Sequence, residues 1–168
     1  MSDLPIQIVD EDNQPIGQAT KQVVWRKGLI HRVVRIMAEN LRGEVLLQKR
    51  TPDKDIFPDT WDNSAAGHVD AGESYLTAAQ REIAEELGLT DVSLTEIGNY
   101  YVDSTWHGLR FKRFTKVYKM CLEVLPTKLE QGKVSEVRWF TIADMKRLVA
   151  EQPEKCSDGL MQVVERYY

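Results

Sequence analysis

The sequence is poor in cysteine and proline and contains no long apolar run. Two cysteines and six prolines among 168 residues argue against a disulfide-stabilised scaffold and against a fibrous or disordered chain. We expect both thiols, Cys121 and Cys156, to be reduced residues of the core. No apolar stretch approaches the ~18 residues that cross a bilayer, and the N-terminal segment MSDLPIQIVDEDNQ has no basic leader. These absences predict a cytoplasmic protein without a membrane segment.

A basic excess is missing as well. The chain has 22 lysines and arginines against 26 aspartates and glutamates, for a formal net charge of -4. Proteins that bind long nucleic acids usually carry excess positive charge, so we expect a small-molecule partner instead. Nothing in the composition fixes the oligomeric state, and a homodimer stays open as one option.

Hydrophobic patterning predicts an α/β fold with a mixed β-sheet sandwiched between helices. An acidic turn flanked by short apolar runs predicts an N-terminal β-hairpin. Apolar residues at every fourth position predict a central helix over 74–87, which Gly88 ends. Further helices are expected over 22–29, from Thr141 to about Val149, and from Ser157 or Asp158 to the C-terminus. Strands are expected over 6–9, 16–19, 31–38, 44–49, 94–102, 111–122 and 134–140.

No repeat or long linker divides the chain, so we expect one domain over 1–168. Its parts are an N-terminal hairpin and short helix (1–30), a core (31–150) and a C-terminal helix (151–168). The segment 51–61 is expected to be a loop that runs into small residues over 63–67.

Three glutamates of the central helix, Glu82, Glu85 and Glu86, are expected on one helix face. Carboxylates so close repel one another, so a cation would stabilise the arrangement. Mg²⁺ and Mn²⁺ are the natural candidates, because hard divalent ions prefer oxygen ligands. On their own, however, the three glutamates favour a solvated acidic surface.

The residues around this helix change that interpretation. Gly67, five residues, Glu73, seven residues and then REIAEELGL over 81–89 resemble the signature of the Nudix hydrolases at every fixed position. The resemblance implies the Nudix fold, in which the signature forms a loop, a helix and a loop. It also implies a set of metal ligands, which are the Gly67 carbonyl and the carboxylates of Glu82, Glu85 and Glu86.

The activity that this resemblance implies is metal-assisted hydrolysis of a diphosphate linkage in a small, nucleotide-like molecule. Arg81 and Glu73 would orient the ligands through an ion pair. Glu82 or Glu85 could act as general base, and Glu136, just before an expected strand, is a weaker candidate for that role.

The stretch 31–68 also resembles isopentenyl-diphosphate isomerase, which shares the Nudix fold but moves a double bond. Arg50 and Lys54 are similar to the pair that grips the diphosphate in that enzyme, and WDNS over 61–64 follows its pattern. His31 and His68 match two of its metal-binding histidines. We therefore expect Arg50, Lys54 and His68 to bind substrate, and His31 to be a satisfied buried histidine.

The residues that carry out the isomerase reaction are not matched in this sequence. Ala66 stands where the isomerase has its catalytic cysteine, and LRFKR over 109–113 stands where it has a glutamate pair. An isomerase-like hydrolase is therefore the better interpretation, with the isomerase itself and a non-catalytic nucleotide-sensing module as alternatives. Outside the signature, we expect a solvated edge strand for the basic run Arg110, Lys112, Arg113 and Lys116, and core positions for Tyr100, Tyr101 and Trp106.

Overall fold

The computed structural model describes residues 4–168. Residues 1–3 lie outside this range. They are the first residues of the segment 1–30, which sequence analysis assigned to the N-terminal hairpin and short helix. The elements in chain order are β1 (Ile6–Val9), β2 (Pro15–Ala19), α1 (Lys21–Lys27), β3 (Ile30–Glu39), β4 (Glu44–Arg50), β5 (Trp61–Asp62), β6 (Ala65–His68), α2 (Tyr75–Leu87), β7 (Thr95–Trp106), β8 (Leu109–Cys121), β9 (Val134–Thr141), α3 (Ile142–Glu151), a 3₁₀ turn (Pro153–Lys155) and α4 (Asp158–Tyr167).

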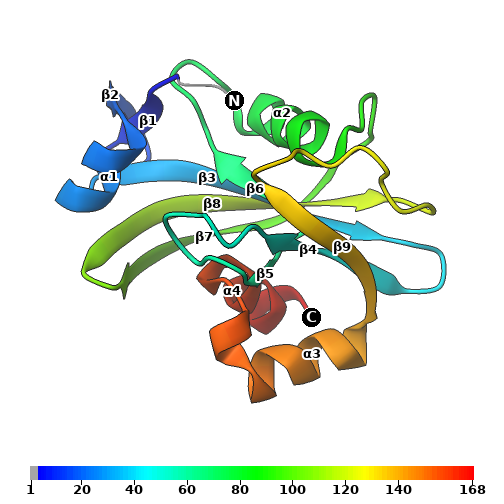
Figure 1. The fold of residues 1–168 in the computed structure, drawn as a ribbon. Coiled ribbons are helices and arrows are strands. Elements are labelled where there is room, and N and C mark those ends of the chain that lie inside the picture. Colours follow the sequence, from blue (N-terminus) through cyan, green and yellow to red (C-terminus); the bar gives the residue numbers. More distant parts are fainter. Residues whose placement is uncertain (1–3) are drawn as a thin grey trace.

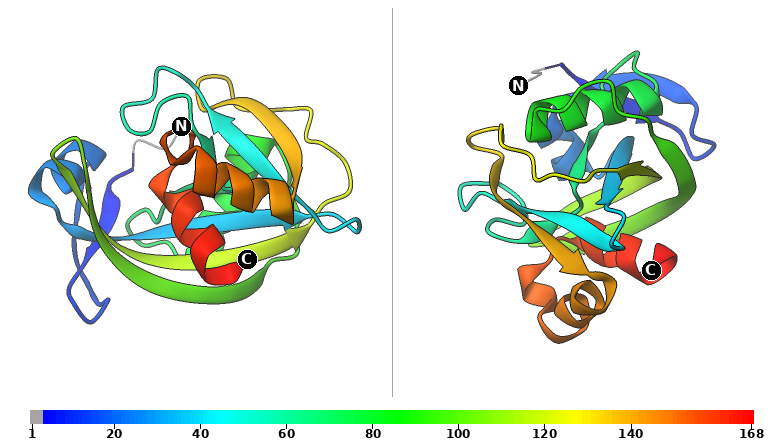
Figure 2. Two further views of the ribbon diagram at one scale, coloured as in Figure 1. Left: turned by 90° about the horizontal axis from the view of Figure 1, so that it is seen from below. Right: turned by 90° about the vertical axis from the view of Figure 1, so that its right-hand side faces the viewer.

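The predicted sandwich is confirmed. The described strands form one nine-stranded sheet that contains antiparallel pairs and one parallel pair, β3 with β8. Helix α2 covers one face of the sheet, while α3 and α4 cover the other (Figures 1 and 2). None of the helices within residues 4–168 is long and apolar enough to span a membrane.

Strand β8 is an interior strand, so the prediction of a solvated edge was wrong. It pairs with β3 along one side and with β7 along the other. Its odd-numbered residues from Phe111 to Val117 are buried, whereas Arg110 is exposed. The sequence alternates in the same way for an edge and an interior strand, and only the long-range pairing with β3 separates the two.

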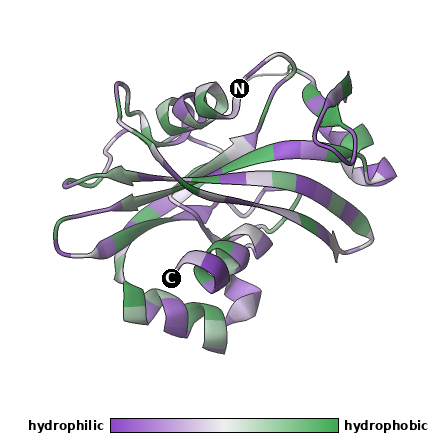
Figure 3. Ribbon diagram, turned by 180° about the vertical axis from the view of Figure 1, so that it is seen from behind, coloured by the Kyte–Doolittle hydropathy of each residue, from purple (hydrophilic) through white to green (hydrophobic). Residues whose placement is uncertain are grey.

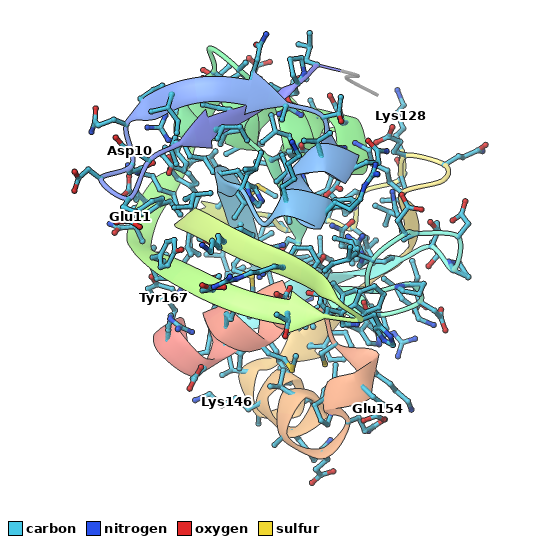
Figure 4. All side chains as sticks on the ribbon, turned by 90° about the vertical axis from the view of Figure 1, so that its left-hand side faces the viewer. Asp10, Glu11, Lys128, Lys146, Glu154 and Tyr167 are labelled. Carbon is cyan, nitrogen blue, oxygen red and sulfur yellow. The ribbon has the colours of Figure 1, made fainter. Side chains whose placement is uncertain are left out.

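The N-terminal hairpin and the helix ends follow the predicted turn and capping chemistry. In the hairpin turn, the carboxylate of Asp10 accepts hydrogen bonds from the backbone N–H groups of Asp12 and Gln14 at 3.0 and 2.8 Å. Ser157, rather than Asp158, caps α4 by accepting a hydrogen bond from the Leu160 N–H at 3.0 Å. Asp10 and other polar residues labelled in Figure 4 point away from the body of the protein.

Two apolar layers hold the helices to the sheet. Alternate residues of β3 separate them, since Val34 and Ile36 pack under α2 while Met37 packs under α3 and α4. The strands accordingly change between hydrophobic and hydrophilic residues along their length (Figure 3). Cys156 is buried as expected, but Cys121, the last residue of β8, is exposed, so the core prediction is wrong for that thiol.

Candidate active site

The segment around α2 brings the predicted glutamates to the wall of a cavity. The helix begins after Ser74, whose hydroxyl oxygen accepts a hydrogen bond from the Thr77 N–H at 3.1 Å. Its apolar side packs on the sheet. Glu82 and Glu86 are 6% and 5% exposed and line the cavity, while Glu85 is less buried. The helix therefore holds two carboxylates almost out of water.

Strand β6 lies close against these two glutamates. A Cβ atom on Gly67 would lie only 1.9 Å from Oε1 of Glu82, so only glycine fits there without displacing that carboxylate. Glu86 accepts hydrogen bonds on Oε2 from the Ala66 N–H at 3.1 Å and from Nε2 of Gln48 at 2.8 Å. Two strands and one helix thus fix the position of the Glu86 carboxylate.

Arg81 joins the helix to the loop before it. Its guanidinium donates to both carboxylate oxygens of Glu73 at 2.8 and 2.9 Å and to the His68 carbonyl at 2.9 Å. A further hydrogen bond of 2.7 Å reaches Oε1 of Glu82. This forked geometry, which lysine cannot reproduce, orients Glu82 and is the ion pair that the sequence predicted.

The two buried carboxylates are costly to ionise together. Burial, followed by the nearby charge of Glu82, raises the pKa of Glu86 to about 8. Burial also raises the pKa of Glu82, against the lowering effect of Arg81. A divalent cation between them would remove this cost, because opposite charge favours the ionised form.

Lys133, which sequence analysis missed, supplies positive charge to the same cluster. Its ammonium lies 2.8 Å from Glu85, 3.1 Å from Glu130 and 3.8 Å from Glu82. Although burial opposes the change, the hydrogen bond from Lys133 lowers the pKa of Glu85. Lys133 lies at the end of the loop before β9 and has no local sequence signal.

The donor set fits a hard divalent ion chemically, since it consists of carboxylate and carbonyl oxygens. In the observed side-chain arrangement, Arg81 and Lys133 occupy these oxygens instead. No three His, Cys, Asp or Glu side chains within residues 4–168 converge as a metal site. A metal ion at Glu82 and Glu85 would therefore have to displace the ammonium of Lys133.

Two of the three glutamates, Glu82 and Glu86, line a cavity of about 630 Å³, which the predicted basic residues also reach. Arg50 uses its guanidinium to hold the loop that follows it, by donating to the carbonyls of Phe57 and Ile56 at 3.1 and 3.0 Å. It also lies 3.3 Å from Asp62. Lys54 has no ion pair within the described residues, and burial, followed by the charge of Arg50, lowers its pKa. Lys54 is thus the freer of the two cations.

The two predicted histidines lie together beside this cavity. The rings of His31 and His68 stack with their centroids 5.3 Å apart, and His68 lines the cavity. Nδ1 of His31 is 2.9 Å from the Leu29 carbonyl, but its Nε2 has no partner within residues 4–168. Burial lowers the pKa of His31 to about 4, so the ring is neutral at pH 7. His31 is thus buried as expected but only half satisfied.

Other sequence candidates lie away from the cavity. Glu136 is half-buried, does not line the cavity, and accepts a hydrogen bond from Arg138 at 3.0 Å. Tyr100 packs against the α3 and α4 layer, whereas Tyr101 is 43% exposed. Trp106 packs on Phe57, with the ring centroids 4.9 Å apart. The core prediction holds for Tyr100 and Trp106 and is wrong for Tyr101.

Three further basic residues that the sequence did not place there line the cavity, namely Lys21 of α1, Arg35 of β3 and Arg113 of β8, and Asp53 and Asp55 line it as well. Arg35 and Arg113 are 8% and 4% exposed. Arg113 forms an ion pair with Asp158 of α4. Buried arginines on interior strands are uncommon, and such a pair was not visible without the pairing of β3 with β8.

Comparison with known proteins identifies the family. The model of the NUDIX domain matches residues 29–158. The chain belongs to the Nudix hydrolase family. It is 36% identical over 152 residues to an uncharacterized Nudix hydrolase of Pseudomonas aeruginosa, covering 90% of this chain and 86% of that protein. It is 35% identical over 136 residues to the uncharacterized Nudix hydrolase YfcD of Escherichia coli K12, covering 81% and 73%.

An isomerase and a solved structure are also similar to this chain. An isopentenyl-diphosphate Delta-isomerase of Nocardia farcinica is 31% identical over 165 residues and covers 96% of this chain and 93% of its own. The crystal structure of DR0079 from Deinococcus radiodurans superposes with a TM-score of 0.80 at 26% identity, covering 98% and 99%. The predicted Nudix fold and family are thus confirmed, and the protein is a Nudix-type pyrophosphohydrolase that acts on phosphorus-containing acid anhydrides.

Proposed function

We propose that this enzyme hydrolyses a diphosphate linkage in a nucleoside diphosphate derivative or a similar small molecule, with Mg²⁺ or Mn²⁺ as its cofactor. The observation that carries the proposal is one cavity of about 630 Å³ lined both by the buried carboxylates Glu82 and Glu86 and by the cations Arg50 and Lys54. A diphosphate needs fixed cations and a metal ion beside it, and the metal ion needs carboxylates. The volume suits a molecule of nucleotide size.

Each residue has a separate task in this proposal. Gly67, Glu82, Glu85 and Glu86 would hold the metal ion, which supplies charge neutralisation at the diphosphate and a lowered pKa for the attacking water. Arg81, anchored on Glu73, keeps Glu82 in place by its 2.7 Å hydrogen bond. Lys54 binds phosphate oxygens with its unpaired ammonium, while His68 contacts the organic part of the substrate.

Glu85 is the better candidate for the general base. It is more exposed than Glu82, so water reaches its carboxylate more easily. Glu82 is the alternative. Glu136 is the weakest candidate, because its side chain would have to break its hydrogen bond with Arg138 and move to the cavity. It would act as the general base only if neither Glu82 nor Glu85 is required.

A substrate panel tests the proposal. Nucleotide sugars, dinucleotides and nucleoside triphosphates are incubated with Mg²⁺ or Mn²⁺, and phosphate or nucleoside monophosphate release is measured for the wild type and Glu86→Gln. Glu165→Gln is the matched control, because Glu165 lies on α4 and is 77% exposed. The proposal fails if no compound is hydrolysed faster by the wild type than by Glu86→Gln. Tight binding without turnover would favour a nucleotide-sensing module instead.

Isopentenyl-diphosphate isomerisation is the second candidate, favoured by the isomerase relative and by the stacked pair of His31 and His68. Two features speak against it. Ala66 lines the cavity without a thiol, and Phe111 and Arg113 lie in the segment where carboxylates would be needed. Incubation with isopentenyl diphosphate decides the matter, since double-bond migration would overturn the hydrolase proposal.

A further inference from the structure

Arg35 and Arg113 lie in neighbouring strands beside the cavity and have more hydrogen-bond donors than partners. Both line the cavity and are more than nine-tenths buried, at 8% and 4% exposed. Strands β3 and β8 run parallel, and Arg113 is in register with His31. The two guanidinium groups lie close enough for the charge of Arg35 to lower the pKa of Arg113, after burial as the main cause.

The partners that the structure provides leave Arg35 underused. Its closest carboxylate is Asp62 at 3.7 Å, which is beyond hydrogen-bond length. That carboxylate is already engaged, because Oδ1 accepts from the Ser157 hydroxyl at 2.7 Å and Oδ2 lies 3.3 Å from Arg50. Nε of Arg35 has no partner within residues 4–168. Arg35 therefore shares its nearest carboxylate with Arg50 and Ser157 and has no carboxylate at hydrogen-bond distance.

Arg113 is better paired but is not satisfied either. Its Nη2 donates to Asp158, and the Ser104 hydroxyl lies 3.4 Å away. Its Nε lacks a partner within the described chain, as does Nε2 of His31. Trp25 Nε1, from a third element lining the same cavity, is likewise without a partner in residues 4–168. Native proteins leave few buried polar groups unpaired, so several around one cavity indicate that a ligand belongs there.

The charges around this region favour an anionic ligand. Among these buried groups, Arg35, Arg50 and Arg113 share two carboxylates, Asp62 and Asp158. The other carboxylates of the cavity lining belong to Glu82 and Glu86 on α2 and to Asp53 and Asp55 in the loop after β4. Lys21 and Lys54 line the same cavity and add further positive charge. A purely structural cluster that joins α4 to the sheet would be expected to balance its charges, because an unbalanced buried charge is destabilising.

We propose that Arg35 and Arg113 form a second anion subsite, which binds a phosphate or carboxylate that the substrate carries in addition to its diphosphate. This inference rests on the proposed hydrolase function and narrows its substrate class to molecules that carry a further anionic group besides the diphosphate. Arginine suits such a group, because its planar fork binds two oxygens of a phosphate or carboxylate at once. The cavity of about 630 Å³ has room for both anionic groups.

Matched substrate pairs test the subsite. UDP-glucuronate differs from UDP-glucose by a carboxylate, and NADPH differs from NADH by a phosphate, so the two pairs also separate the two kinds of anion. In at least one pair, kcat/KM for the more anionic member should exceed that of its partner by about tenfold, the size of one charge-assisted hydrogen bond. Hydrolysis of both members at equal rates in both pairs would overturn the subsite while leaving the hydrolase function intact.

Three variants separate recognition from folding. Arg35→Met removes the charge together with the 3.7 Å ion pair to Asp62, and Arg113→Met combined with Asp158→Asn removes both charges of a buried ion pair. Both should reduce the substrate preference about tenfold. Lys116→Met is the control, because Lys116 lies on β8 but pairs with Glu96 and does not line the cavity.

Binding gives a readout that does not need catalysis. Calorimetric titration of each pair into Glu86→Gln, with and without Arg35→Met, measures the same preference in the absence of turnover. An unchanged preference in Arg35→Met, with thermal stability close to that of the wild type, would show that Arg35 serves only the packing of α4. If no diphosphate is hydrolysed but the binding preference follows Arg35, the hydrolase function fails and the subsite stands.

Discussion

Replacing Lys133 by methionine should strengthen metal binding while it destabilises the metal-free protein. The Lys133 ammonium lies 2.8 Å from Glu85, 3.1 Å from Glu130 and 3.8 Å from Glu82, and only 11% of the side chain is exposed. Methionine keeps most of the aliphatic stem and removes the charge. The three carboxylates then lose the cation that they share.

The expected magnitude follows from the contact that metal has to replace. A hydrogen bond to a charged group contributes about 1.5–3 kcal/mol. The wild type gives up this contact between Lys133 and Glu85 when a metal ion binds, whereas the variant gives up nothing. The apparent metal dissociation constant should fall by about tenfold to a hundredfold, since about 1.4 kcal/mol corresponds to a factor of ten. The metal-free variant should lose about 1–3 kcal/mol of stability, because charged groups are left unpaired.

Thermal unfolding in EDTA and over a series of Mg²⁺ and Mn²⁺ concentrations measures both effects, because a ligand of the folded state raises stability according to its affinity. Lys128→Met is the matched control. Lys128 belongs to the same loop but is exposed and points away from the protein (Figure 4). Metal affinity equal to or weaker than that of the wild type in Lys133→Met would refute the competition between ammonium and metal.

Three other substitutions test the acidic cluster. Glu86→Gln should flatten the pH dependence of stability in EDTA. The pKa of Glu86 is raised from 4.5 to about 8 in the folded protein. The stability that protonated Glu86 contributes is therefore fully present below pH 4.5 and is lost as the pH rises to 8. At about 1.4 kcal/mol per pKa unit, the free energy of unfolding of the variant should rise by a few kcal/mol relative to the wild type near pH 8. Parallel curves of unfolding free energy against pH for the two proteins would contradict this. Gly67→Ala should lower kcat/KM by about a hundredfold, because its Cβ would lie 1.9 Å from Glu82; unchanged kinetics in a folded variant would argue against that clash. Arg81→Lys should weaken metal activation by about tenfold to a hundredfold through loss of the fork to Glu73, and a metal titration like that of the wild type would count against this role.

The acidic half of the site could be predicted because it is encoded locally. Glu82, Glu85 and Glu86 share one face of a helix whose period, first turn and final glycine are all visible in the sequence. The resemblance to the Nudix signature implied that Gly67 lies beside these glutamates, and a Cβ on Gly67 would indeed lie 1.9 Å from Glu82. Arg81 reaches Glu73 within the same segment. No long-range pairing is needed to bring these residues together.

The basic half could not be predicted, because long-range pairing creates it. Arg35 and Arg113 become neighbours only through the parallel pairing of β3 with β8, which no local pattern specifies. Lys133 reaches the glutamates from the loop before β9. The short strands β5 and β6 were missed for a related reason. Strand β6 contains alanine and glycine, which have low strand propensity, and β5 has only two residues. Pairing with β3 and β4 makes them strands.

The acidic and basic halves of the site depend on different parts of the fold, and this affects how the enzyme selects its substrate. The metal-binding half depends on α2 and β6, whereas the position of Arg35 depends on α4, since a Cβ on Gly159 would lie 2.3 Å from the Arg35 guanidinium carbon. Asp158, beside that glycine, pairs with Arg113. Changes at the start of α4 can therefore alter which anionic group the cavity accepts without moving Glu82 or Glu86. The C-terminal helix, which carries no residue of the hydrolase signature, would in this way set substrate choice.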